Sequence, residues 1–166
     1  AYNKISGSVD SKLGERANCE NLIPLYKREF DKFKNDGVWL QRAAGRMLSK
    51  ECTEAPLFFK LVNAFHNLDP SAKSAYYLGI LKDKEGKSTE ALDYYKQAVE
   101  LETSSYEKSK ILNRIASKFR KKGSYGKARS YYSKALANNP SLGSAHIAIA
   151  AMYAKSAKNC GTDNFS

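Results

Sequence analysis

Three cysteines and two histidines are the residues whose side chains could support redox or metal chemistry. The cysteines are odd in number and lack Cys-x-x-Cys spacing; they are Cys19, Cys52 and Cys160. The two histidines, His66 and His146, stand 80 positions apart. Metal ligands usually recur in close pairs along a sequence. We therefore expect no metal ion and no cofactor, and a disulfide is the chemistry that remains for the cysteines.

Motifs for catalysis are absent from the sequence. The chain has no Gly-x-x-x-x-Gly-Lys-Ser/Thr or Gly-x-Gly-x-x-Gly loop for phosphate, no His-Glu-x-x-His and no Gly-x-Ser-x-Gly elbow. The sequence therefore predicts a protein that is not an enzyme.

Two predicted helices, over 22–35 and 38–50, would position the first two cysteines. An antiparallel hairpin places the start of one helix beside the end of the other, where Cys19 and Cys52 could reach the Cα separation of ~5.5–6 Å that a disulfide needs. Two interpretations stay open. One is a bridge worth roughly 3–4 kcal/mol, which would indicate an oxidising compartment; the other is two ordinary thiols near helix ends.

Capping signals mark the helix ends. Asn21 is the expected N-cap of the first helix, with Pro24 in its first turn, and Thr53 is the expected N-cap of a third helix, with Pro56 in its first turn. Ser104 followed by Glu107 predicts a capping box. Further helices are expected at 71–85, 88–102, 105–122, 125–138 and 141–158.

Small and aromatic residues recur between positions 75 and 140. One set is Ala75, Leu78, Gly79, Gly86, Ala91, Tyr95 and Ala98, and the next is Leu112, Ile115, Ala116, Phe119, Gly123, Ala128, Tyr132 and Ala135, closed by Pro140. Small residues allow antiparallel helices to pack closely, and aromatic ones fill the wider gaps. This pattern resembles the tetratricopeptide (TPR) family. The resemblance implies an all-α, right-handed superhelical stack of antiparallel helical hairpins, an α-solenoid, with a concave binding face.

The expected organisation is a single helical domain over 21–158. It follows a flexible arm at 1–20 and precedes a tail at 159–166, beyond which we expect further residues. Its parts are degenerate helices at 21–67, repeats at 70–103 and 104–140, and a half repeat at 141–158.

The TPR resemblance also implies a peptide-binding groove, because the first helix of each pair lines the concave face in that family. The matching positions here are Lys73, Tyr76, Ile80, Lys110, Asn113, Ser117, Arg120, Lys121 and Ile147, with Ser144, Ala151 and Lys155 also on the last helix. The clamp with which the family captures chaperone tails is not reproduced, since Ile80 and Ser144 replace its polar residues. We expect a protein or peptide partner.

The net charge of +11 favours acidic partners. The leading hypothesis is a protein-protein interaction scaffold. The alternatives are a repeat region that positions another part of a larger envelope protein, and a basic binder of anionic polymers; nucleic acid is the less favoured partner. Apolar runs are too short for a membrane span.

A narrower resemblance concerns location. The segments Cys52-Thr-Glu-Ala-Pro56, Leu68-Asp-Pro-Ser-Ala72, Ala128-Arg-Ser-Tyr131 and Asn159-Cys-Gly161 resemble exported tetratricopeptide proteins of Bacteroidetes-type bacteria. That resemblance implies the periplasm or cell envelope; the cytoplasm is the alternative.

Overall fold

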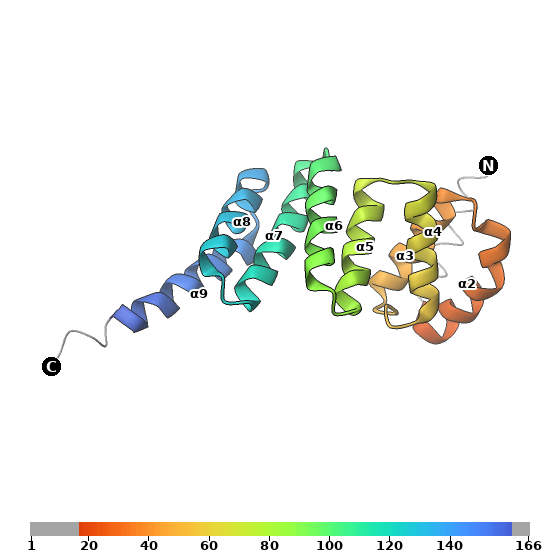
Figure 1. The fold of residues 1–166 in the computed structure, drawn as a ribbon, viewed down its shortest axis with the longest axis horizontal. Coiled ribbons are helices and arrows are strands. Elements are labelled where there is room, and N and C mark those ends of the chain that lie inside the picture. Colours follow the sequence, from red (N-terminus) through yellow and green to blue (C-terminus); the bar gives the residue numbers. More distant parts are fainter. Residues whose placement is uncertain (1–16, 161–166) are drawn as a thin grey trace. The chain divides into compact units, whose positions relative to one another are not determined.

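A computed structural model of the chain describes residues 17–160, with side chains as far as Lys155. The described part contains eight α-helices and no strand (Figure 1). The predicted arm before residue 17 and the tail after residue 160 lie outside the described residues. The helices are α2 (Cys19–Phe33), α3 (Gly37–Ser49), α4 (Pro56–Leu68), α5 (Ala72–Lys84), α6 (Ser88–Leu101), α7 (Ser105–Lys121), α8 (Tyr125–Asn138) and α9 (Gly143–Cys160).

Two compact units make up the chain, where the sequence predicts a single domain. The first unit ends at Tyr94 and the second begins at Tyr95, in the middle of α6. Helices α2 to α5 belong to the first unit, and α7 to α9 belong to the second.

The core of the first unit comes from apolar stripes that recur at helical spacing. Helix α3 packs on α4, α4 packs on α5, and α2 contacts both α3 and α4 (Figure 1). Helix α4 is apolar on most of its circumference because it lies between neighbours. The buried side chains of α2, α3 and α4 are Leu22, Tyr26 and Phe30 of α2, Leu40, Ala43, Ala44 and Met47 of α3, and Leu57, Phe58, Leu61, Val62 and Phe65 of α4.

Two of the predicted caps are wrong. Asn18, not Asn21, caps α2: its side chain accepts the backbone N–H of Asn21 at 3.0 Å. The helix therefore starts three residues earlier than predicted, which places Pro24 inside it instead of in the first turn. Helix α4 begins after Ala55 without a side-chain cap, and Thr53 is buried before it. Pro56 at the first position needs no partner for a backbone N–H, so α4 can start there.

The capping box predicted for α7 is half formed. Ser104 Oγ accepts the backbone N–H of Glu107 at 3.4 Å. In a complete capping box the Glu107 side chain would accept the backbone N–H of Ser104. Here the Ser104 N–H donates to Glu102 Oε1 at 2.9 Å instead. The Glu107 carboxylate instead pairs with Lys110.

Helices α3, α5 and α7 end in the same way. Gly86 and Gly123 have φ of 76° and 75°, as expected for glycines that end helices, and the residue after each donates back to a carbonyl five positions earlier. Glu51 takes this left-handed position after α3, with φ of 60°, and the Cys52 N–H donates to the Met47 carbonyl at 2.8 Å. The three helices therefore share one C-terminal geometry, whether glycine or glutamate takes the left-handed position.

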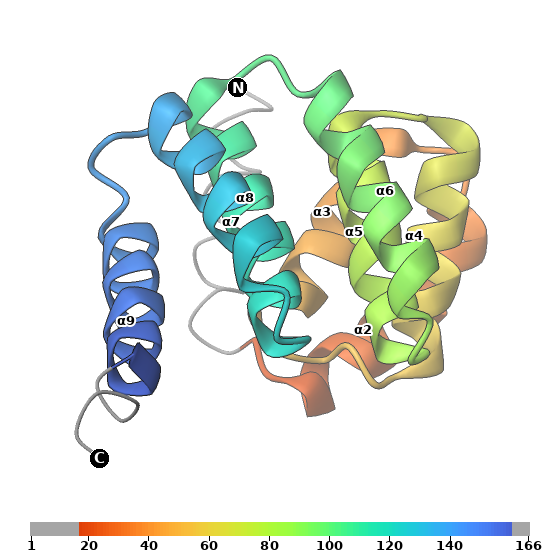
Figure 2. The same ribbon diagram turned by 60° about the vertical axis from the view of Figure 1, so that its left-hand side comes forward.

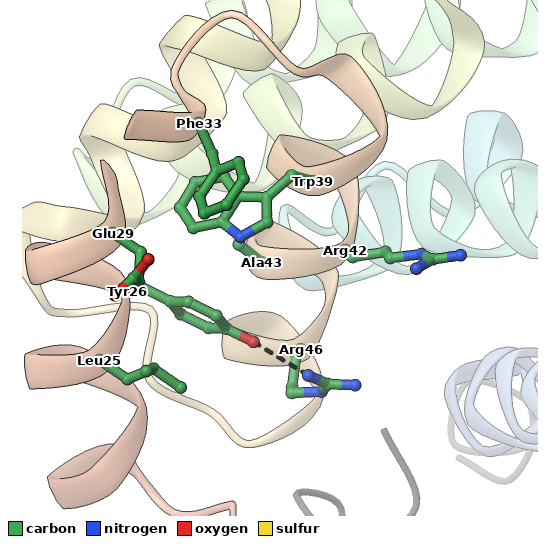
Figure 3. Close-up of a pocket in the computed structure, with 8 residues that line it drawn as sticks. All are labelled: Leu25, Tyr26, Glu29, Phe33, Trp39, Arg42, Ala43 and Arg46. Atoms are coloured by element: carbon green, nitrogen blue, oxygen red, sulfur yellow. Dashed lines mark hydrogen bonds between the residues drawn. The ribbon is translucent and has the colours of Figure 1, made fainter. Parts of the chain in front are cut away.

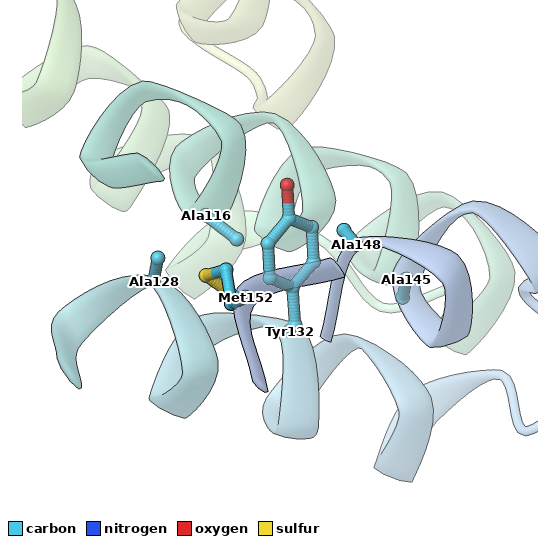
Figure 4. Close-up of a cluster of buried hydrophobic side chains, with 6 residues drawn as sticks. All are labelled: Ala116, Ala128, Tyr132, Ala145, Ala148 and Met152. Carbon is cyan, nitrogen blue, oxygen red and sulfur yellow. The ribbon is translucent and has the colours of Figure 1, made fainter. Parts of the chain in front are cut away.

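The second unit is packed through small side chains. Helix α7 packs along α8, and α8 packs against α9 (Figure 2). Tyr132 points from α8 into a cluster in which most partners are alanines (Figure 4). Alanine at a helix contact lets the two backbones approach closely, so one aromatic ring can fill the remaining space. The cluster consists of Ala116, Ala128, Tyr132, Ala145, Ala148 and Met152.

Candidate functional site

One face of α7 carries the residues predicted to bind a partner. Lys110, Arg120 and Lys121 are exposed, and Asn113 and Ser117 are half-buried. These positions recur every three or four residues, which aligns them along the helix. The face of α7 that holds Ile111, Leu112, Ile115 and Ala116 is buried. The predicted residues of α7 are therefore accessible to a ligand.

A pocket of about 240 Å³ lies where α7, α8 and α9 meet. It brings Arg120 of α7 together with Ala151 and Lys155 of α9, three positions assigned to the groove from sequence; Tyr125 and Met152 complete the lining. Two of these five residues are cations and none is acidic. The pocket is therefore suited to an anionic group.

Lys155 is oriented by Tyr125. Its Nζ donates to the Tyr125 hydroxyl at 2.9 Å and lies 5.4 Å from the centre of the ring. The hydrogen bond to Tyr125 raises the pKa of Lys155. The ammonium group therefore stays charged at neutral pH.

Asn113 carries a buried polar atom without a partner among the described residues. Its Oδ1 is buried and accepts no hydrogen bond there. Leaving a buried acceptor unpaired costs about 1–3 kcal/mol. A donor from a bound molecule would remove that cost if the Asn113 amide turned toward the surface.

Lys110 is already engaged. Its Nζ lies 3.1 Å from Glu107 Oε1 and 4.0 Å from the centre of the Tyr106 ring. The hydrogen bond to Glu107 raises the pKa of Lys110. An acidic ligand would have to compete with Glu107, so Lys110 is a weaker anchor than Arg120 or Lys155.

The other predicted groove residues differ in exposure. Lys73 is exposed, Tyr76 is half-buried with its ring 6.2 Å from that of Tyr77, and Ile147 is 72% exposed. Ile80 is only 2% exposed, which corrects its assignment to an open groove. Helix α5 is buried around most of its circumference, so this apolar side chain packs inside the protein.

A second pocket, of about 260 Å³, was not predicted from the sequence. It opens between α2 and α3 and is bordered by three aromatic rings and two arginines (Figure 3). The spacing of Arg42 and Arg46, one helical turn apart and following Trp39, was the available signal. The lining residues are Leu25, Tyr26, Glu29, Phe33, Trp39, Arg42, Ala43 and Arg46.

A disulfide joins Cys19 to Cys52, as one of the two sequence interpretations predicts. The Cα atoms are 5.4 Å apart, within the usual range. The bridge ties the first residue of α2 to the segment that follows α3 and closes a separation of 33 residues. The side chain of Cys160 lies outside the described residues.

Among the residues that the structure describes, no group of three His, Cys, Asp or Glu side chains could hold a metal ion. None of the helices described there combines the length and the apolar character needed to cross a bilayer.

Comparison with known proteins supports the fold. No family profile matches the chain. Two crystal structures of MamA align with a TM-score of 0.72 at 19% identity, one covering 88% of this chain and 83% of MamA and the other 93% and 82%. This likeness confirms the predicted all-α helical-repeat fold.

Curated relatives match a shorter part. Photosystem I assembly protein Ycf3 from Cuscuta gronovii and from Cuscuta obtusiflora are each 41% identical over 69 residues, which is 41% of this chain. The match also spans 41% of the length of these relatives. The resemblance to exported proteins of Bacteroidetes-type bacteria stays a prediction.

Proposed function

We propose that this chain is a non-enzymatic protein-interaction scaffold whose second unit holds an acidic, extended peptide along α7 and α9. The observation that carries the proposal is the pocket shared by Arg120 and Lys155. Two cations on different helices can bind carboxylates at separate points of one peptide. Charge-assisted hydrogen bonds are roughly twice as strong as neutral ones.

The side chains along α7 extend this surface. Asn113 Oδ1 is buried and lacks a partner among the described residues, so the amide would have to turn outward to accept a peptide N–H. Arg120 and Lys121 add charge in the last turn of the helix. An extended peptide exposes one N–H and one C=O per residue, which suits recognition of its backbone by Asn113 and of its acidic side chains by the cations.

The relatives agree with a scaffold role. The two Ycf3 proteins are named for the assembly of photosystem I, and assembly depends on contacts between proteins. Their partners are not transferred to this chain.

A charge-reversal experiment tests the proposal. A fluorescein-labelled peptide of about ten residues, rich in Asp and Glu and without aromatic residues, would be titrated with the protein and followed by anisotropy. Because charged hydrogen bonds contribute about 1.5–3 kcal/mol each, Arg120→Glu with Lys155→Glu should weaken binding at least ~10-fold. Lys127→Glu with Lys134→Glu, an equal charge change on exposed positions of α8, is the control.

Competition separates this proposal from the alternative of a generic polyanion binder. Phosphate-driven binding weakens steeply with salt and does not depend on one pocket. If both double variants lose affinity equally, or if single-stranded DNA displaces the peptide as well as unlabelled peptide does, the groove proposal fails. If the proposal passes this test, a pull-down read by mass spectrometry would name the partner. It would compare the full-length chain with the Arg120/Lys155 double variant.

We also infer export to an oxidising compartment such as the periplasm or cell envelope. The Cys19–Cys52 pairing supports this, because disulfides persist in such compartments and are rare in the cytosol. Thiol titration of denatured, unreduced protein from that compartment should find Cys19 and Cys52 blocked. Free thiols at both positions would contradict the inference.

A further inference from the structure

The outer face of α8, in the second unit, takes no part in the proposed peptide groove. We propose that this face binds the surface of a membrane that contains anionic lipids. Its cations would contact the lipid phosphate groups, and no part of the chain would need to cross the bilayer. The α8 face consists of Lys127, Arg129 and Lys134 together with Gly126, Ser130, Ser133 and Ala137.

A strip of small side chains forms the middle of the α8 face. Helix α8 buries Ala128, Tyr132 and Ala135 on its inner side. The strip lies on the opposite side, because its residues recur every three or four positions and all of them are exposed. No large side chain projects from the strip, so a flat surface can approach the helix closely.

Two lysines border the strip on the side of α7, and each lies over an aromatic ring. Lys127 Nζ is 5.7 Å from the centre of the Phe119 ring, and Lys134 Nζ is 5.2 Å from that of Tyr131. The two rings stack on each other with centroids 5.4 Å apart. An aromatic ring attracts a cation but carries no net charge. The rings therefore hold the lysines in place without neutralising them.

Arg129 borders the strip on the side of α9. Its Cζ lies 5.3 Å from the centre of the Tyr153 ring, which is 59% exposed. A tyrosine has an apolar body and a polar hydroxyl, which suits the boundary between lipid headgroups and water. Tyr153 can therefore add an interfacial contact beside the positive charge of Arg129.

Acidic residues do not offset the charge of the α8 face. The sequence contains no Asp or Glu between Glu107 and Asp163. None of the three cations forms an ion pair with a carboxylate of the described residues. The face therefore attracts an anionic surface, whereas the same charge on a second copy of the chain would repel it.

The shape of the α8 face favours a membrane over other anionic partners. Proteins that bind single strands use a basic groove and stack bases on aromatic rings. Here the strip is the outside of a helix, and Phe119 and Tyr131 are partly buried against each other. Protein interfaces depend on large anchoring side chains, which the strip lacks. A lipid surface requires only cations close to its phosphate groups.

Binding to vesicles tests the proposal. The intact protein would be sedimented with vesicles of phosphatidylcholine that contain about 30 mol% phosphatidylglycerol, and with vesicles of phosphatidylcholine alone. It should bind the anionic vesicles and not the neutral ones. Raising the salt from about 0.05 M to about 0.5 M should weaken binding, because salt screens exposed charges.

Lys127→Gln with Lys134→Gln removes two charges from the α8 face. A cation near an anionic membrane contributes about fivefold in affinity, so this variant should bind anionic vesicles at least ~10-fold more weakly. Lys32→Gln with Lys60→Gln is the matched control, since these exposed lysines of the first unit also lie over rings. The control should lose less than ~3-fold. Lys127→Arg with Lys134→Arg, which keeps the charge, should bind like the wild type.

The proposal is overturned if the protein binds neither kind of vesicle or both equally, or if the Lys127/Lys134 glutamine variant keeps full affinity. It also fails if single-stranded DNA at an equal phosphate concentration releases the protein from vesicles, which would assign the face to a nucleic acid. These outcomes are separate from those of the peptide groove. The glutamine variant should keep its affinity for the acidic peptide, because neither lysine lines the pocket of Arg120 and Lys155.

Discussion

The α2–α3 hairpin and the α7–α9 group are stabilised by different means. The hairpin combines a disulfide, a cluster of aromatic rings and polar caps at Asn18 and Asp36. The buried cluster of the α7–α9 group consists of four alanines, Met152 and Tyr132, and the partly buried rings of Phe119, Tyr125 and Tyr131 pack against it. Both pair antiparallel helices, but only the second depends on close approach of the backbones.

This contrast matters for where ligands can bind. Helices that pack through alanine leave little space between them, so the proposed peptide would lie along exposed faces of the second unit and at the junction near Arg120. Helices separated by rings leave a gap, and the pocket near Trp39 lies in it. The two pockets have similar volumes, about 260 and 240 Å³, but three aromatic rings line the first and a single ring lines the second.

The largest effect should come from emptying the centre of the alanine cluster. Tyr132 is 2% exposed, so Tyr132→Ala should lower the free energy of unfolding by about 3–5 kcal/mol. Urea unfolding followed by circular dichroism measures it. Tyr153→Ala on α9 is the control, because that ring is 59% exposed and should change stability by less than ~0.5 kcal/mol. Equal losses in the two variants would mean that Tyr132 is not central to the packing.

Removing the disulfide tests the hairpin in the same way. Cys19→Ser with Cys52→Ser should cost about 3–4 kcal/mol, because the unfolded chain regains the entropy of an open loop. Trp39 fluorescence reports on this hairpin, and its urea midpoint should fall. Wild-type protein treated with a reductant should behave like the double variant, and Cys160→Ser should not. A midpoint unaffected by either treatment would contradict the stabilising role of the bridge.

A larger side chain at a helix contact tests whether the second unit depends on close approach of its helices. Ala128 is fully buried, and Ala128→Leu should destabilise the protein by about 1–3 kcal/mol because the helices must move apart. Ala137→Leu on the same helix is the matched control, since Ala137 is exposed. If the first variant is as stable as the second, the helices do not require a small residue at their contact.

The smallest effect concerns the end of α3. Glu51 has φ of 60°, a conformation that costs a residue with a Cβ roughly 1–2 kcal/mol. Glycine removes that cost but makes the unfolded chain more flexible by about 0.4–1 kcal/mol. Glu51→Gly should therefore gain about 0.5 kcal/mol in thermal unfolding, whereas Lys50→Gly, at φ of −100°, should lose stability. A loss at both positions would show that Glu51 is not strained.

The repeats were predictable because their signals are local. Gly86 and Gly123 adopt the left-handed conformation that ends a helix, and Ala91 and Ala128 are fully buried as the repeat pattern requires. The Cys19–Cys52 pairing was one of two interpretations that the predicted hairpin left open, and the structure contains it. Each of these features depends on the residue itself or on adjacent helices.

The candidate sites were less predictable because they depend on tertiary packing. Ile80 falls at a groove position by counting, but α5 is buried on most sides. Asn21 and Thr53 have side chains suited to capping. Nevertheless, Asn18 caps α2, and α4 begins at Pro56 without a side-chain cap. The pocket near Trp39 exists because rings from two helices leave a gap, which the spacing within either helix does not indicate.

The bridge at the start of α2 has a consequence for limited proteolysis. Residues 34–36 connect α2 to α3, and they are exposed. A protease that cuts there would produce two fragments that still migrate as one band on a non-reducing gel, since Cys19 and Cys52 lie on opposite sides of the cut. The fragments would separate only after treatment with dithiothreitol.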